Sequence, residues 1–560
     1  MRNKKLFIIL LIFLVAFVAR FYKLGLVPTG LSQDETSIGY NAYSILETGA
    51  DEYGKFFPIN FKAFGEYKLP IYIYLSVPSV EYFGNTPMGV RFPSAILGFL
   101  TVIVFYFMVK NLTKNNSIII ISTFLLAINP WHINFSRAAF EVVPALFFIV
   151  LGVYLFIKFV DKKNLLYLIT SGIFFILSMY TYNVCRIFAP ILFFTLLYFY
   201  RNEINFKKTS IWISLSSLIF FLFPFLISIV SQGGFESTKG TLLYSSASVQ
   251  APLLELRSMV LINNDFMATI FFNKFILTIF EYLKNIVDYF SVSFFFVSGS
   301  THGNHGIGNV GMFYLFEFIS IIIGVFAGLK NKQKWIALLF IWIIEEILVA
   351  SLTREAPHGT RGFFLIPPLI ILSGYGLYVL GKYVAKLNFK FRMAIILSSV
   401  LLMIFNLLFY FSSYYFRFPL LYGSSWRSED ESLVSYIREH ENNYNRVVFD
   451  LDSPFVYTSL AYYLPYSPQQ FVKNVRRGPD DSEGFSRVHS FGKYSFEKID
   501  WGNQNLMHKT LIVSTLQNVA GRASIIKTFY YPKRPVVIAR GQEILQFPTE
   551  DVAYVLVEIK

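Results

Sequence analysis

Long apolar runs recur along the chain from the N-terminus to about residue 411 and then stop. Several of them approach the ~20 residues that a helix needs to cross the hydrocarbon core of a bilayer. Of the 560 residues, 54% are hydrophobic and only 15% are charged, which is too little polar surface for a water-soluble protein. The sequence therefore predicts a mainly α-helical, polytopic integral membrane protein with a polar domain at its C-terminal end.

Lysine and arginine give the chain a formal net charge of +14, but they lie mostly in short clusters between the apolar runs, such as MRNKK, KFVDKKN and KNKQKW. This is the distribution of cytoplasmic loops and not that of a phosphate-binding stripe, so no nucleic acid partner is expected. Placing the clusters in the cytoplasm predicts about eleven transmembrane helices, a cytoplasmic N-terminus and an extracytoplasmic C-terminal domain in the cell membrane. The predicted helices lie near residues 6–20, 88–109, 116–131, 139–160, 164–183, 187–200, 210–231, 312–330, 335–352, 362–380 and 393–412.

Two of these assignments have alternatives. The first run has the basic flank of a signal peptide, but no convincing A-x-A cleavage site follows it, so we expect a retained helix. The runs at 164–183 and 187–200 are also compatible with one hairpin of shorter elements. Cys185 is the single cysteine, so neither a disulfide framework nor a cysteine zinc site is expected.

The composition changes at Ser412, where charged residues become mixed with alternating apolar ones. We expect a membrane domain over residues 1–411, with its first outer loop at 21–87, and a small extracytoplasmic α/β domain over 412–560. In the latter, SLVSYIREH predicts a helix, whereas RVVFDLD, KTLIVST, RPVVIAR and VAYVLVEIK predict strands.

The first outer loop carries an unusual set of charges close to the membrane. Its segment SQDE has the pattern of a helix capping box, in which Ser32 caps the helix and Glu35 reaches back, and both acids favour the helix dipole. The same loop continues into FGEYKLP, with Glu66 and Lys68 before the next apolar segment. Such charges at a membrane surface are costly unless they are solvated, paired or used, so a structural and a functional reading both stay open.

Another outer segment, TREAPHGTR at 353–361, has two arginines and a histidine on the side of the membrane where basic residues are disfavoured. An anionic group is therefore expected beside it.

Several motifs together resemble the membrane glycosyltransferases of the GT-C type, in the family 39 branch that includes the protein O-mannosyltransferases and the aminoarabinose transferases of lipid A. The motifs are DE after the first helix, GEYKLP, VRFPSA, NPWHINFSR, YTYNVCRIFAP and LTREAPHGTRGFFLIPPL, within about residues 1–410. The resemblance implies a transferase that moves a sugar from a polyprenyl-phosphate donor to an acceptor on the outer face, by a single displacement that inverts the anomeric centre. The acceptor is left open among a lipid, a glycan and a protein.

The resemblance maps a general base onto Asp34, with Glu66 organising the first-loop site and Glu35 orienting the sugar or the acceptor. A positioned carboxylate can take the proton of the attacking hydroxyl, and cationic side chains can stabilise the departing lipid phosphate. The candidates for binding that phosphate or the sugar are Lys68, Arg137, Tyr182, His358 and Arg361.

Each binding candidate also has a purely structural reading. Arg137 fits an interfacial arginine that snorkels beside Trp131, and Tyr182 fits an interfacial aromatic residue. Lys68 fits a simple ion pair with Glu66, and Arg361 a local pair with Glu355.

The segment GSTHGNHGIG places His302 and His305 among glycines. Two histidines are too few ligands for a zinc site, so a flexible outer loop is expected and no metal ligand is assigned. Related enzymes that transfer oligosaccharides use a divalent cation, so a divalent cation as cofactor is left open.

The sequence leaves two alternative functions. A transporter or flippase of lipid-linked sugars is the main alternative, but the ionisable residues concentrate in outer loops and no pair of interrupted helices marks a midplane site. A receptor-like protein that works through its C-terminal domain would leave the charged first loop unexplained.

Overall fold

The computed structural model describes residues 2–63, 66–231, 242–245, 247–263, 270–331, 333–451, 456–480, 486–501, 509–519, 523–532, 534–540, 543–549 and 551–558. Parts of the segment 232–311, between the predicted helices at 210–231 and 312–330, therefore lie outside the described residues. The chain forms two compact units. Unit 1 comprises Met1–Tyr22, Ser94–Ser136 and Phe140–Phe411, and unit 2 comprises Lys23–Pro93, Arg137–Ala139 and Ser412–Lys560.

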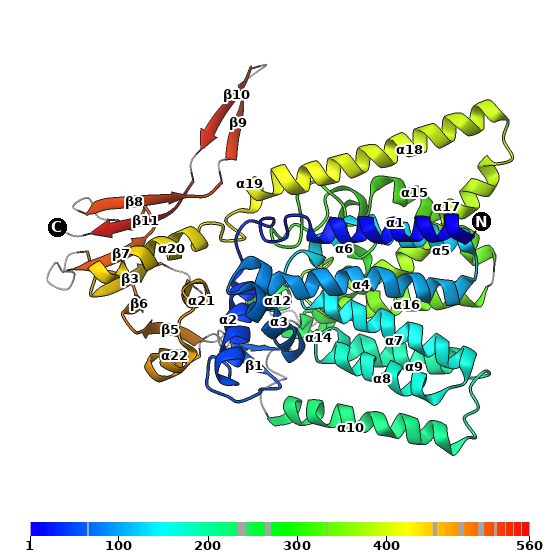
Figure 1. Cartoon of the computed structure of the whole chain (residues 1–560), viewed down its shortest axis with the longest axis horizontal. Coiled ribbons are helices and arrows are strands. Elements are labelled where there is room, and N and C mark those ends of the chain that lie inside the picture. Colours follow the sequence, from blue (N-terminus) through cyan, green and yellow to red (C-terminus); the bar gives the residue numbers. More distant parts are fainter. Residues whose placement is uncertain are drawn as a thin grey trace. The chain divides into compact units, whose positions relative to one another are not determined.

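Unit 1 is helical in the part that the structure describes (Figure 1). Its helices are α1 (Arg2–Phe21), most of α4 (Pro87–Thr113), α5 (Asn116–Ile128), α6 (Pro130–Ser136), α7 (Val142–Lys162), α8 (Leu165–Met179), α9 (Cys185–Phe199), α10 (Thr209–Ser231), α12 (Ala247–Asn263), α14 (Lys274–Asp288), α15 (Leu315–Lys330), α16 (Lys334–Ala350), α17 (Ile366–Val384) and α18 (Phe389–Ser412), with short turns η1 (Leu243–Ser245), η2 (Ser293–Val297) and η3 (Phe363–Leu365).

Each of the eleven predicted transmembrane segments coincides with a helix in this set, within a few residues at its ends, but the number of membrane crossings is not confirmed. Among the described residues, five helices are long and apolar enough to span a bilayer, or six if α5 and α6, which meet at a 50° bend, form one broken span. The helices at 165–179 and 185–199 are shorter apolar helices, which agrees with the alternative of a hairpin of shorter elements.

Small residues bring α15 and α17 into close contact. An ideal Cβ at Gly324 would lie 2.0 Å from the carbonyl oxygen of Leu372, and one at Gly376 would lie 1.8 Å from that of Ser320. The hydroxyls of Ser320 and Ser373 also hydrogen-bond across this contact at 2.7 Å. Small residues allow two membrane helices to approach this closely. At these glycines the backbones of α15 and α17 are in direct contact.

Unit 2 contains a seven-stranded mixed sheet in the order β4-β5-β6-β3-β7-β11-β8, in which β3 is parallel to β6 and β7 (Figure 1). Its strands are β3 (Arg446–Asp450), β4 (Arg476–Asp480), β5 (Ser486–Phe491), β6 (Tyr494–Phe496), β7 (Thr510–Ser514), β8 (Ser524–Tyr530) and β11 (Val552–Glu558), and β9 (Arg534–Arg540) pairs with β10 (Glu543–Thr549) in a separate hairpin. The helices and turns of this part are η4 (Ser413–Arg417), α19 (Phe418–Tyr422), α20 (Asp430–His440), η5 (Glu441–Asn443), α21 (Val456–Tyr463) and α22 (Pro468–Asn474). The expected α/β character of the C-terminal part is confirmed.

The first outer loop belongs to the same unit as this sheet. It forms α2 (Gln33–Thr48), the hairpin of β1 (Phe61–Ala63) and β2 (Glu66–Lys68), and α3 (Pro70–Phe83). Buried side chains of α2, such as Ile38 and Tyr40, share one hydrophobic core with Leu460 of α21 and Phe471 of α22. Residue 412 is one of the points where the chain passes from unit 1 to unit 2, and the division into domains 1–411 and 412–560 stays a prediction.

Candidate functional site

The N-terminus of α2 has the predicted capping box. The hydroxyl of Ser32 accepts a hydrogen bond from the backbone N–H of Glu35 at 3.3 Å, and the Ser32 N–H donates to Oε2 of Glu35 at 3.0 Å. The box satisfies donors that a helix start otherwise leaves unpaired, and it determines the direction in which the first turn presents Asp34.

Glu35 is buried, and each of its oxygens accepts two hydrogen bonds. Nε and Nη2 of Arg91 donate to Oε1 and Oε2 at 2.8 and 3.0 Å, in a bidentate pair. The backbone N–H of Ala139 donates to Oε1 at 3.0 Å, and the Ser32 N–H completes the set. The carboxylate therefore joins the first loop, the start of α4 and the segment 137–139.

Asp34 has the opposite surroundings to Glu35. Its side chain is 56% exposed, and its Oδ1 lies 2.6 Å from Nζ of Lys68, whose own side chain is only 7% exposed. Lys68 ends β2, where its backbone lies opposite Phe61. The lysine thus pairs with Asp34, whereas a pair with Glu66 was one expectation. The backbone of Glu66 lies in β2 opposite Ala63, and its side chain is outside the described part of the structure.

Arg137 is fully buried in unit 2. Its Nε donates to the hydroxyl of Tyr414 at 3.1 Å, and its Nη2 donates to the carbonyl of Val27 at 3.1 Å. The guanidinium also lies over the rings of Tyr414 and Tyr415, at 5.2 and 5.4 Å from their centroids. These contacts hold the arginine inside the protein, so it is not a snorkelling surface residue.

The other three predicted binding residues meet in unit 1. Tyr182, His358 and Arg361 line one pocket of about 160 Å³ together with Asn183, Val184, Ile187, Leu242, Val349, Leu352, Thr353 and Thr360. Arg361 donates to the backbone carbonyl of Arg354, and its Nη2 lies 3.9 Å from a carboxylate oxygen of Glu355, which is a loose ion pair. Burial, assisted by the charge of Arg361, lowers the pKa of His358, so its imidazole is neutral at pH 7.

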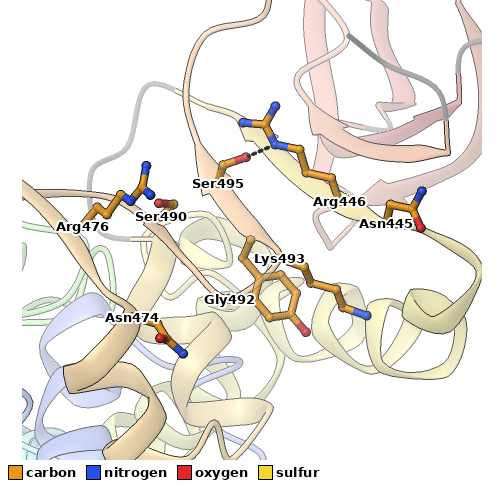
Figure 2. A pocket seen from close by; sticks show the side chains of 9 residues that line it. Asn445, Arg446, Asn474, Arg476, Ser490, Gly492, Lys493 and Ser495 are labelled. Atoms are coloured by element: carbon orange, nitrogen blue, oxygen red, sulfur yellow. Dashed lines mark hydrogen bonds between the residues drawn. The ribbon is translucent and has the colours of Figure 1, made fainter.

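The structure thus gathers the predicted residues into two groups, one in each unit. A larger hollow, of about 460 Å³, lies in unit 2 among Asn445, Arg446, Asn474, Arg476, Ser490, Gly492, Lys493, Tyr494 and Ser495, and it contains none of the predicted site residues (Figure 2). There Arg446 pairs with Glu497 and hydrogen-bonds to Ser495, and Lys493 pairs with Glu441. The residues that line this hollow include no carboxylate that could act as the expected general base.

Sequence reasoning missed Arg91, the partner of Glu35. Arg91 is fully buried, donates to the carbonyls of Pro28 and Gly30 and lies over the Trp426 ring, 5.5 Å from its centroid. The signal was available, because the residue stands in VRFPSA, where a lone arginine precedes a long apolar helix.

Sequence reasoning also missed Glu52, a second fully buried acid in unit 2. The hydroxyl of Tyr457 donates to its Oε1 at 3.0 Å, and Nη2 of Arg477 lies 3.9 Å away. Burial raises the pKa of Glu52 to about 7, in spite of the nearby arginine. This acid connects the first loop to α21 and β4. It follows the C-terminal end of α2, whereas Asp34 lies in the first turn of that helix.

Comparison with known proteins gives two findings on the class. The sequence pattern of the dolichyl-phosphate-mannose-protein mannosyltransferase family matches residues 10–232, less than half of the chain. The structure resembles that of ArnT from Cupriavidus metallidurans bound to undecaprenyl phosphate, with a TM-score of 0.57, 11% identity and coverage of 99% of this chain and 97% of ArnT. The apo state of the same protein gives a TM-score of 0.50 at 12% identity, with 99% and 98% coverage.

An archaeal oligosaccharyltransferase, AglB from Archaeoglobus fulgidus, overlaps with 82% of this chain at 13% identity and a TM-score of 0.47; this chain spans 64% of its length. No curated protein matches the chain. At these identities the likeness to ArnT concerns the fold alone. The ArnT likeness confirms the expected GT-C type fold, and the family match over residues 10–232 agrees with the expected resemblance. Several helices of the described residues are long and apolar enough to cross a membrane.

Proposed function

We propose that the chain moves a sugar from a polyprenyl-phosphate donor to an acceptor on the extracytoplasmic face of the membrane, with Asp34 as the general base and inversion of the anomeric centre. The contrast between Asp34 and Glu35 carries the proposal. One acid is exposed at the start of α2 and held by Lys68, whereas its neighbour is buried and saturated with hydrogen bonds. Of the two acids, Asp34 is the one whose side chain solvent, and therefore an acceptor hydroxyl, can reach.

The reaction needs a base and a charge to stabilise the leaving phosphate. The acceptor hydroxyl loses its proton to the Asp34 carboxylate as its oxygen forms the bond to the anomeric carbon, while the bond from that carbon to the phosphate oxygen breaks. A donor phosphodiester becomes a monoester that carries one more negative charge, so a nearby cation lowers the barrier more than a proton donor would. Lys68 holds the carboxylate of Asp34 at the start of α2 through an ion pair of 2.6 Å.

The pocket of Tyr182, His358 and Arg361 supplies cationic and hydrogen-bonding groups of the kind that bind a lipid phosphate. ArnT, the structure of similar fold, was solved with undecaprenyl phosphate bound. We assign the donor phosphate of this chain to Arg361 on these two grounds.

Glu35 and Arg137 take positioning roles in this proposal. Both are buried with their polar atoms engaged in unit 2, and both link the first loop to residues far along the chain. Their loss would displace Asp34 without removing a group that touches the substrate. Glu66 is proposed to organise the same loop through its place in β2.

The experiment is sugar transfer from a panel of radiolabelled polyprenyl-phosphate sugars by the purified full chain in detergent. Wild type is compared with Asp34→Asn, and both transfer and donor hydrolysis are measured. Glu439→Gln is the matched control, because it removes an exposed carboxylate from α20 in the same unit. Loss of a positioned base typically costs ~10²–10⁴-fold in rate, and we expect that loss for Asp34→Asn alone.

Full activity of Asp34→Asn would show that Asp34 is not the general base. If folded wild-type protein turns over no donor, but labelled donor crosses the bilayer of proteoliposomes, the protein is a flippase of lipid-linked sugars.

A further inference from the structure

Three histidines from two separate segments of the sequence converge in unit 1. His302 and His305 come from the glycine-rich segment and His358 from the TREAPHGTR segment, and the ligand nitrogens that they offer all lie within 4.8 Å of one another. The ring centroids of His305 and His358 are 4.7 Å apart, and those of His302 and His358 are 5.3 Å apart.

The backbone of both segments supports this convergence. The N–H groups of His305 and Gly306 both donate to the carbonyl of His302, at 2.9 and 3.0 Å, which forms a tight turn between the first two histidines. A Cβ at Gly306 would lie 2.1 Å from the carbonyl oxygen of Ser300, so only glycine fits this turn. On the other segment a Cβ at Gly359 would lie 3.3 Å from Cβ of His305, so the two segments are already in close contact.

The orientation of His358 suits a ligand. Its Nδ1 accepts a hydrogen bond from the backbone N–H of Thr360 at 3.3 Å and lies 2.9 Å from the hydroxyl of Thr360, so Nε2 is the ring nitrogen left for the cluster. In a tetrahedral zinc site with bonds of ~2.0–2.1 Å, ligand atoms are ~3.3 Å apart. Nitrogens that now lie within 4.8 Å of one another would have to approach by up to ~1.5 Å to reach that spacing.

We infer that His302, His305 and His358 form a binding site for a divalent transition-metal ion, zinc in the first place, which ties the two outer segments together. Imidazole nitrogens favour zinc and its neighbours over magnesium and calcium, which prefer oxygen. The carboxylate of Glu355 is the nearby oxygen donor, since its Oε2 lies 3.6 Å from Nε2 of His302. The site shares His358 with the pocket proposed for the donor phosphate, but zinc binding can be measured without any sugar donor.

The charges around the cluster are mixed. Arg354 and Arg361 oppose a cation, and Glu355 lies within 4 Å of both guanidinium groups and of His302, where it offsets part of their charge. A bound ion would therefore attract the Glu355 carboxylate. In the zinc titration, Glu355→Gln should lower the affinity for zinc less than the loss of one histidine does.

The test is metal binding by the full chain, purified in detergent without a polyhistidine tag and stripped with a chelator. Zinc titration is followed by calorimetry, and bound zinc is counted by mass spectrometry after dialysis. We expect one zinc ion per wild-type chain, at least tenfold weaker binding for His302→Ala, His305→Ala and His358→Ala, and unchanged binding for the control His489→Ala, an exposed histidine of β5.

Thermal unfolding separates a lost ligand from a misfolded chain. We expect zinc to raise the Tm of wild type and His489→Ala but not of His302→Ala, whose metal-free Tm should equal that of wild type because its ring is largely exposed. The inference is wrong if wild type retains no zinc, or if the three histidine variants retain as much as wild type does. It is also wrong if X-ray absorption of the bound zinc shows no imidazole shell.

Discussion

At the scale of single residues, Asp34 and Glu35 are neighbours in the chain with opposite surroundings. The capping box turns Glu35 inward to Arg91 and leaves Asp34 outside beside Lys68. A buried ion pair that loses one partner leaves an uncompensated charge, whereas an exposed pair contributes little to stability. The two acids should therefore separate stability from chemistry.

Glu35→Gln should destabilise the protein strongly, by about 3–5 kcal/mol, because Arg91 keeps its charge in a buried place. Asp34→Asn should leave the Tm close to that of wild type. Both are measured by intrinsic-fluorescence melting in one detergent. A wild-type Tm for Glu35→Gln, or a large loss for Asp34→Asn, would contradict the roles assigned to these acids.

Glu52 makes a prediction about pH. Because folding raises its pKa from 4.5 to about 7, the folded protein holds this proton more tightly than the unfolded chain does. Its contribution to stability is present below pH 4.5 and is lost as the pH rises through 7, by up to about 3 kcal/mol. Glu52→Gln keeps the acceptor for Tyr457 without the charge, so its Tm should fall less than that of wild type between pH 5 and 8. Parallel pH profiles of the two proteins would show that Glu52 does not titrate in this range.

The residue-level prediction from sequence was good where the contact is local and poor where it is not. Ser32 and Glu35 lie three apart, so the capping box was visible in the pattern SQDE. The partners Arg91 and Ala139 lie 56 and 104 residues away, and nothing in the pattern around Glu35 points to them. His358 was expected to meet a phosphate, but its neighbours His302 and His305 were assigned to a flexible loop, because two ligands in sequence do not reveal a third.

At the scale of helices and strands, the contact between α15 and α17 gives a matched pair of variants in one helix. Gly376→Ala would place a methyl group 1.8 Å from the carbonyl of Ser320, whereas Gly381→Ala would meet nothing within 4 Å. We expect Gly376→Ala to lower the Tm and the yield of folded protein, and Gly381→Ala to behave as wild type. Equal behaviour of the two alanine variants would contradict the close approach of these helices.

Helices were predictable from the sequence and strands only in part. Apolar runs near the length of a membrane span located all eleven predicted helices, but length alone could not decide how many cross the bilayer. In the C-terminal part the expected strands match β3, β7, β9 and β11, whose residues are rich in valine and isoleucine. Strands such as β4, with the sequence RRGPD, have no such pattern and are formed by pairing with β5.

At the scale of the whole molecule, the orientation in the membrane is a prediction of the charge distribution. Single cysteines in a Cys185→Ala background would test it: Lys473→Cys on α22, expected outside, and Lys162→Cys at the end of α7, expected in the cytoplasm. A membrane-impermeant maleimide should label the first on intact cells and the second only after permeabilisation. The reverse pattern would invert the topology and place the acids of the first loop in the cytoplasm.

Unit 2 is assembled from three stretches that the ribosome makes at very different times. Residues 23–93 are among the first to emerge, but the core around α2 also needs α21 and α22, and the sheet that supports those helices closes only with β11 at the end of the chain. Most of unit 1, Ser94–Ser136 and Phe140–Phe411, is synthesised in between, a delay on the order of tens of seconds at ordinary rates of translation. A nascent or truncated chain thus holds Asp34 in an unfinished first loop, and the carboxylate proposed as the base is in place only when the chain leaves the ribosome.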